Sequence, residues 1–295
     1  MHRRYGLTRL LALAAMALVP AWGSAALLTI GPGDGFFPRV LTQLPTSAPI
    51  SGTALSTLGD GSVGFNGGLA SDGSGLFAIG NDSLGASRLY SMTAGGGSLT
   101  PVGSGLGFGF YGGLAYRATG SGGDLFAIAS DSIAASTLYK VTGGSATVVG
   151  SGLGSGFYGG LTYNADDGLL YAIAGDTFGV QRVLMSIDAD TGAATPAFNL
   201  GDGSIGFNGG LAYDADADRF FVIGNDSLAN SSLYSFTLSG PGSVSAIGSS
   251  FGQGFLNASL VLLPDGGTPV PEPSTLMLLS GLLWLGRCPR RGPRR

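Results

Sequence analysis

The sequence predicts an all-β fold: a five-bladed β-propeller of four-stranded antiparallel blades, with the ring closed by strands from both ends of the domain. Three observations predict this fold. A motif first seen as GFNGGLASDGSGLFAIGNDS, at residues 64–83, returns three times along the chain. Each copy belongs to a unit with four short β-like runs. The segments before the first unit and after the last unit are complementary fragments of one more unit.

The repeat has the period of a propeller blade. The second glycine of each Gly-Gly pair falls at Gly68, Gly113, Gly160 and Gly210, in steps of 45, 47 and 50 residues. Four strands in that length are typical of a blade. A coil of a β-helix is usually much shorter, the nonapeptide of calcium-binding rolls is absent, and an ordinary sandwich has no reason to repeat its sequence.

Within the first unit, we expect strands near residues 68–70, 76–80, 88–92 and 98–103. These runs alternate in polarity or are rich in β-branched and aromatic residues, while glycine, aspartate, asparagine and serine fill the gaps. No helical period of useful length occurs between the two ends of the chain. The middle of the chain is therefore predicted to contain strands and turns.

The fifth blade is predicted to be a composite. Residues 26–60 align with the last three strands of a unit, since ALLTIG matches GLFAIG and PRVLTQ matches SRLYSM. They lack the first strand, which residues 254–266 supply. A blade sealed by both ends leaves no exposed strand edges in the ring. We therefore assign the propeller to residues 26–268.

Residues 1–25 have the features of a signal peptide. Arg3, Arg4 and Arg9 precede an apolar stretch at residues 10–19, and Gly23 and Ala25 supply the small residues of a cleavage site. The apolar stretch is too short to span a bilayer. The chain is therefore expected to be exported.

The C-terminal segment, residues 269–295, has three parts. It contains Pro271, Glu272 and Pro273, then an apolar run at residues 276–285, and then five arginines. Such arginines would hold the tail on the cytoplasmic side of a membrane. The segment resembles the PEP-CTERM sorting signal in all three parts and in position; the alternative is an ordinary tail anchor that stays.

This resemblance implies a Gram-negative bacterium with an extracellular polysaccharide. It also implies an exosortase as a partner during export, which removes the tail near residues 271–273, while the N-terminal segment implies signal peptidase. The mature protein would reach the cell surface or extracellular matrix after transient anchoring in the inner membrane.

The composition of residues 26–270 excludes several functions. Six basic side chains face seventeen aspartates, a net charge of −11, so nucleic acid is not expected as a partner. The chain's single histidine and single cysteine, His2 and Cys288, lie outside this region, which removes histidine-based triads, thiol nucleophiles and histidine-ligated zinc. We expect a non-catalytic structural or carbohydrate-binding protein; the alternative is an aspartate-based, Ca²⁺-assisted enzyme acting on polysaccharide.

A candidate ligand face precedes each Gly-Gly pair. A phenylalanine there, expected to pack between blades, is followed by Asn66, Tyr111, Tyr158 or Asn208. Amides and aromatic faces suit sugars, although these side chains would equally well just cover the mouth of the channel. Fivefold repetition predicts several weak, equivalent sites acting together on a repetitive polymer.

A second polar element follows the second strand of each unit. It contains Asp82, Asp131, Asp176 and Asp226. Aspartates there either close turns through hydrogen bonds to backbone amides or offer oxygens to Ca²⁺. Alternate connections in an antiparallel blade emerge at the same end, so we expect these aspartates on the same face as the candidate ligand residues. Further acids in the loops between first and second strands, at residues 166–167 and 214–218, are expected to be solvated turns.

Overall fold

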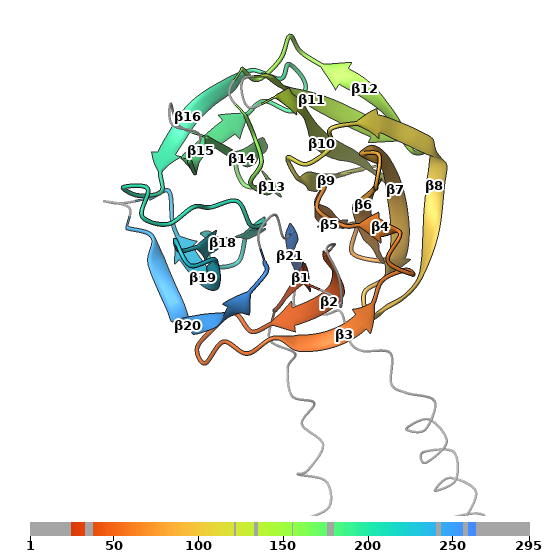
Figure 1. The fold of residues 1–295 in the computed structure, drawn as a ribbon. Coiled ribbons are helices and arrows are strands. Elements are labelled where there is room, and N and C mark those ends of the chain that lie inside the picture. The colour runs from red at the N-terminus through yellow and green to blue at the C-terminus, as the bar shows by residue number, and fades with distance from the viewer. Residues whose placement is uncertain are drawn as a thin grey trace, which may run out of the picture. The chain divides into compact units, whose positions relative to one another are not determined.

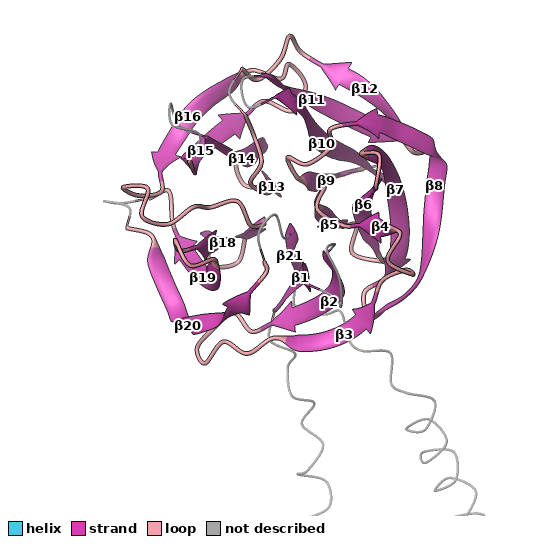
Figure 2. Ribbon diagram, viewed as in Figure 1, coloured by secondary structure: helices cyan, strands magenta, loops and turns pink. Residues whose placement is uncertain are grey.

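The computed structural model describes residues 25–32, 38–120, 122–132, 135–154, 156–175, 180–239, 243–255 and 259–263. These residues form five antiparallel sheets arranged in a ring, as in a five-bladed β-propeller (Figure 1). All their regular elements are strands, joined by turns and loops (Figure 2). The predicted fold class is confirmed. The predicted signal peptide up to residue 24 and the sorting tail with Pro271, Glu272 and Pro273 lie outside the described residues.

The innermost strand of each blade lies beside the channel. These strands are β5 (Leu69–Ser71), β9 (Leu114–Thr119), β13 (Leu161–Asn164), β17 (Leu211–Asp214) and β21 (Ser259–Leu263). The second strands are β6 (Leu76–Asp82), β10 (Gly122–Ser132), β14 (Leu169–Gly175), β18 (Arg219–Asn225) and β1 (Ala26–Pro32).

The third and fourth strands complete the blades toward the outside of the ring. The third strands are β7 (Ala86–Thr93), β11 (Ala135–Thr142), β15 (Gln181–Ile187), β19 (Asn230–Phe236) and β2 (Pro38–Leu44). The outer strands are β8 (Gly96–Phe108), β12 (Ser145–Val149), β16 (Ala194–Asn199), β20 (Ser245–Gln253) and β3 (Thr53–Thr57). Blades 1 to 4 begin with β5, β9, β13 and β17; the composite blade is β21-β1-β2-β3.

The composite blade closes the ring as predicted. β21 pairs antiparallel with β1, with Ala26 opposite Leu263 and Ile30 opposite Ser259. The Oγ1 hydroxyl of Thr29 donates to the Ser259 carbonyl at 2.5 Å. Strands from the two ends of the domain therefore share one sheet, so neither is left as an exposed edge.

The hydrophobic core is divided among the junctions between blades. Five clusters of buried side chains each combine residues of two neighbouring blades, and each contains one phenylalanine of the repeat: Phe65, Phe110, Phe157, Phe207 and Phe255. These phenylalanines are at most 8% exposed. The packing between blades predicted for Phe65, Phe110, Phe157 and Phe207 is confirmed, and burial of each of these rings contributes ~1.5–3 kcal/mol.

The Gly-Gly pair brings the backbones of neighbouring blades into contact. A Cβ atom at Gly113 would lie 2.3 Å from the amide nitrogen of Leu161 in the next blade, and one at Gly160 would lie 2.1 Å from that of Leu211. Gly68 and Gly210 approach the next blade equally closely. At these four junctions, a side chain in place of the second glycine would push the two blades apart.

The inner edge of blade 1 is formed in two pieces. The short strand β4 (Val63–Gly64) pairs with the end of β6, and β5 pairs with the beginning of the same strand. Residues 65–68 lie between these pieces, with a bend at Gly67. Gly109, Gly156 and Gly206 make corresponding backbone hydrogen bonds in blades 2 to 4. This bend brings the candidate ligand residues to the channel mouth.

Candidate functional site

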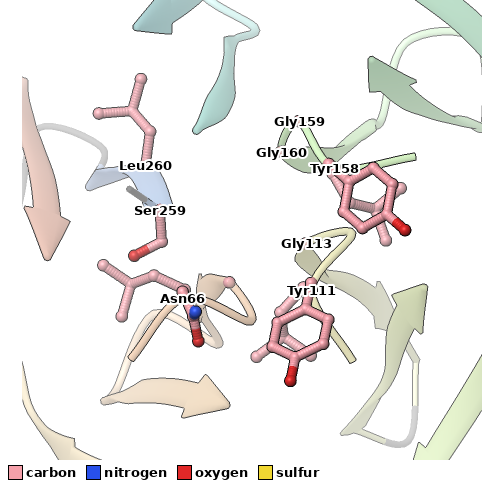
Figure 3. Close-up of a pocket in the computed structure, with 12 residues that line it drawn as sticks. Asn66, Tyr111, Gly113, Tyr158, Gly159, Gly160, Ser259 and Leu260 are labelled. Atoms are coloured by element: carbon pink, nitrogen blue, oxygen red, sulfur yellow. The ribbon is translucent and has the colours of Figure 1, made fainter. Parts of the chain in front are cut away.

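The mouth of the channel brings together three of the four candidate ligand residues. Asn66, Tyr111 and Tyr158, all half-buried, line one pocket with Ser259 and with glycines and leucines of the inner strands. Figure 3 shows the two tyrosine rings side by side, with Asn66 and Ser259 on other sides of the opening. Asn208 is also half-buried but does not line this pocket. None of the lining side chains is charged.

In blades 1 to 4, whether the mouth residue is asparagine or tyrosine goes with the type of residue at one position near the end of the second strand. In blade 1, Asn81 donates its amide to Oδ1 of Asn66 at 2.8 Å and accepts from the Ser87 hydroxyl. In blade 4, Asn225 donates to Asn208 at 3.4 Å. An amide at the mouth is thus supported by a second, buried amide.

The tyrosine blades have smaller residues at the supporting position. Blade 2 has Ser130, whose hydroxyl lies 2.6 Å from that of Ser136. The Ser136 hydroxyl in turn accepts from the backbone N–H of Phe157 at 3.0 Å, which links blades 2 and 3. Blade 3 has Gly175. We did not predict the supporting residues, although the sequence pairs asparagine with asparagine and tyrosine with a small residue.

Asp82 and Asp226 close turns between the second and third strands. Oδ1 of Asp82 accepts from the backbone N–H groups of Leu84 and Ala86, both at 2.9 Å. Oδ1 of Asp226 accepts from the backbone of Leu228 and Asn230, and its Oδ2 accepts from the Asn230 amide at 2.9 Å. The hydrogen bonds from Asn230 hold the pKa of Asp226 below its ordinary value. Of the other two predicted aspartates, Asp131 lies within β10, its side chain not described, and Asp176 is outside the described residues.

The aspartates and the mouth residues share one end of the blades. Val63 pairs with Asp82 and Gly64 with Asn81, so the segment leading to Asn66 runs beside the aspartate turn. The same relation holds in blade 4, where Gly206 bridges to Asn225. Between neighbouring blades, a Cβ atom at Gly85 would lie 3.4 Å from the hydroxyl of Tyr111. In the described blades, the structure brings the two sets to one face.

Two aspartates in the loops between first and second strands accept hydrogen bonds from the hydroxyl of Tyr213, one of them across a blade junction. The Tyr213 hydroxyl lies 2.6 Å from Oδ2 of Asp166 in blade 3 and 3.0 Å from Oδ1 of Asp218 in its own blade. Burial raises the pKa of Tyr213, and these carboxylates raise it further because they would repel a phenolate. The hydrogen bond to Asp166 thus helps hold blades 3 and 4 together, and the one to Asp218 fixes Tyr213 within its own blade.

One aspartate departs from the expected solvated turn. Asp214 is only 8% exposed and its Oδ2 accepts from Arg219 at 3.2 Å, while the guanidinium lies 4.4 Å from the centre of the Phe221 ring. The expectation is wrong here because Asp214 ends β17, inside the sheet, where a buried carboxylate needs a charged partner.

Two kinds of feature are absent from the described ranges. They hold no group of three or more histidine, cysteine, aspartate or glutamate side chains arranged to bind a metal ion. No helix in these ranges has the length and apolar character needed to cross a membrane.

Comparisons with known proteins show the fold. The chain matches no protein family and no curated protein. Among solved structures it is similar to TolB from Acinetobacter baumannii, with a TM-score of 0.50 and 13% identity over 80% of this chain and 55% of TolB. It is similar to the same degree, TM-score 0.50 and 13% identity, to an exo-β-1,3-galactanase from Phanerochaete chrysosporium, over 66% of this chain and 52% of the enzyme. The chain thus spans about half the length of these structures.

Proposed function

We propose that this protein is exported, released from the inner membrane by an exosortase, and binds the producer's extracellular polysaccharide at the channel mouth of its propeller. The observation that carries the binding proposal is the pocket formed by Tyr111, Tyr158 and Asn66. Aromatic faces pack against the C–H faces of sugar rings, and an amide hydrogen-bonds to hydroxyls. An uncharged pocket with aromatic walls and few polar groups suits carbohydrate.

The export proposal is supported by the sequence at the two ends of the chain. A signal-like segment stands at residues 1–25 and a tail resembling the PEP-CTERM signal at residues 269–295. The domain between them carries a net charge of −11, which keeps a protein soluble outside the cell. The cell surface or matrix is the proposed destination.

We propose binding without catalysis. Residues 26–270 contain no histidine, cysteine or glutamate, so three of the side chains that most often act as general acids or bases are missing. The aspartates Asp82 and Asp226, which lie at the same end of the blades as the mouth, already accept hydrogen bonds that close their turns.

The test is co-sedimentation of the purified protein with the producer's own purified polysaccharide, beside an assay for released reducing ends. We expect retention without new reducing ends. Tyr111→Ala combined with Tyr158→Ala should abolish retention while the melting temperature stays near that of the wild type. The matched control is Tyr116→Ala combined with Tyr163→Ala, since those tyrosines line a separate pocket further along the inner strands.

Two results would contradict the proposed function. Wild-type protein that stays in the supernatant contradicts the binding function. Reducing ends that accumulate with time and protein concentration would instead favour the aspartate-based enzyme.

A further inference from the structure

The composite blade breaks the symmetry of the channel mouth. In blades 1 to 4 the residue before the inner strand is glycine. Its carbonyl oxygen accepts a hydrogen bond from a backbone N–H group of the second strand, that of Ile79, Ile128, Ile173 or Ile223. In the composite blade Ile30 stands opposite Ser259 instead. Ser259 thus occupies the place of the second glycine of the repeat. A side chain is present at one position of the ring where the others have none.

The Ser259 side chain is buried and has no hydrogen-bond partner among the described residues. The residue is 3% exposed, and within the described residues its hydroxyl makes no hydrogen bond. It lines the pocket of Asn66, Tyr111 and Tyr158 (Figure 3). A buried hydroxyl without a partner costs ~1–3 kcal/mol, so its natural complement is a polar group that enters from the mouth.

The size of the pocket limits what can enter it. The cavity between the lining atoms has a volume of about 10 Å³. That is room for one oxygen atom with its hydrogen, and not for a sugar ring. A ring must therefore remain above the pocket, beside the tyrosines, and send a single hydroxyl inward.

The charge of the lining limits the class of sugar. None of the lining side chains is acidic or basic, and the domain as a whole carries a net charge of −11. A uronate or sulfated sugar would find no cation at the mouth and would be repelled by the domain. A neutral sugar meets neither penalty.

We infer that the channel mouth is a single, asymmetric site for one neutral sugar residue, which packs on Tyr111 and Tyr158 and directs one hydroxyl to Oγ of Ser259. The amide of Asn66 binds a neighbouring hydroxyl. This inference rests on the proposed function and deepens it. It replaces the several equivalent sites expected from the repeat by one site per molecule, because the composite blade supplies a group that no other blade has.

The experiment uses oligosaccharides released from the producer's polysaccharide and separated by charge into neutral and acidic pools. Isothermal titration of the full chain should give one site per molecule for the neutral pool. Ser259→Ala and Ser259→Gly should each weaken binding about tenfold, the worth of one hydrogen bond of ~1.4 kcal/mol. The glycine variant restores the residue of the other blades, so we expect it to fold.

Two matched controls isolate the site. Ser56→Ala removes the other buried serine hydroxyl without a partner in the described residues, in the outer strand of the same blade, and should leave affinity unchanged. Asn66→Ala should weaken binding, whereas Asn208→Ala, at the equivalent position of blade 4, should not.

The outcomes separate the single-site inference from the proposed binding function. Several sites per molecule, equal effects at Asn66 and Asn208, wild-type affinity in both Ser259 variants, or preference for the acidic pool would overturn the inference while the binding function stands. If the wild type binds neither pool but is retained on the intact polymer, the inference again fails alone. If it binds neither the pools nor the polymer, both fail.

Discussion

The substitution Gly160→Ala adds a methyl group where the backbones of blades 3 and 4 touch, and so tests the close contact between neighbouring blades. The added Cβ would lie 2.1 Å from the amide nitrogen of Leu211 and 2.8 Å from the carbonyl carbon of Gly210. Ordinary contact between such atoms is ~3.5 Å. The neighbours are backbone, so no side-chain rotation relieves the overlap. Blades 3 and 4 must move apart at their inner edge.

The magnitude follows from two separate costs. Overpacking of this kind costs ~1–3 kcal/mol. Gly113→Ala meets the same contact in the preceding junction, at 2.3 Å, but Gly113 also has a φ of 105°. That conformation adds ~1–3 kcal/mol for any residue with a Cβ. We expect Gly113→Ala to lower the free energy of unfolding by about 2–6 kcal/mol, and Gly160→Ala to lower it by about half as much.

Thermal melting measures both effects. A domain of this size loses ~2–4 °C of melting temperature per kcal/mol. Gly95→Ala is the control, because a Cβ there meets nothing within 4 Å. If Gly160→Ala and Gly113→Ala melted together with Gly95→Ala, the close approach of the inner edges would be wrong, and with it the reason for the Gly-Gly repeat.

Three further predictions concern the other parts of the chain. Deletion of residues 256–264 removes β21, the inner partner of β1, and takes Leu260 out of the core. The melting temperature should fall far more than it would for loss of an outer strand. An unchanged melting temperature would contradict ring closure. Asp226→Asn should lower the melting temperature at pH 7. Because the folded-state pKa of Asp226 lies below its unfolded value, its contribution is present above pH ~4 and is lost as the pH falls through the folded pKa, so the difference from wild type should shrink in acid. The exposed Asp216→Asn is the control, and a difference that persists in acid would refute the turn-closing charge. Mass spectrometry of protein recovered from the medium should show no peptides from residues 276–295; finding them would contradict processing of the tail.

The sequence by itself determined the architecture. A repeat of 45–50 residues with four β-like runs predicts a blade, and the complementary segments at residues 26–60 and 254–266 predict a fifth blade shared by the two ends. The common face of Asn66 and Asp82 followed from the alternation of antiparallel strands. These properties are periodic and local, so one copy of the motif carries the same information as the next.

Only the tertiary structure decided how the mouth is built. Asn66 and Asn81 are fifteen residues apart, and their hydrogen bond depends on the bend between β4 and β5. The burial of Asp214, and the choice of turn closure at Asp226, likewise depend on where strands end in the sheet. The sequence did not point to Ser259, because a repeat predicts only what its copies share and Ser259 differs from the other copies. Its buried hydroxyl has neighbours from three other blades, which only the folded structure brings together.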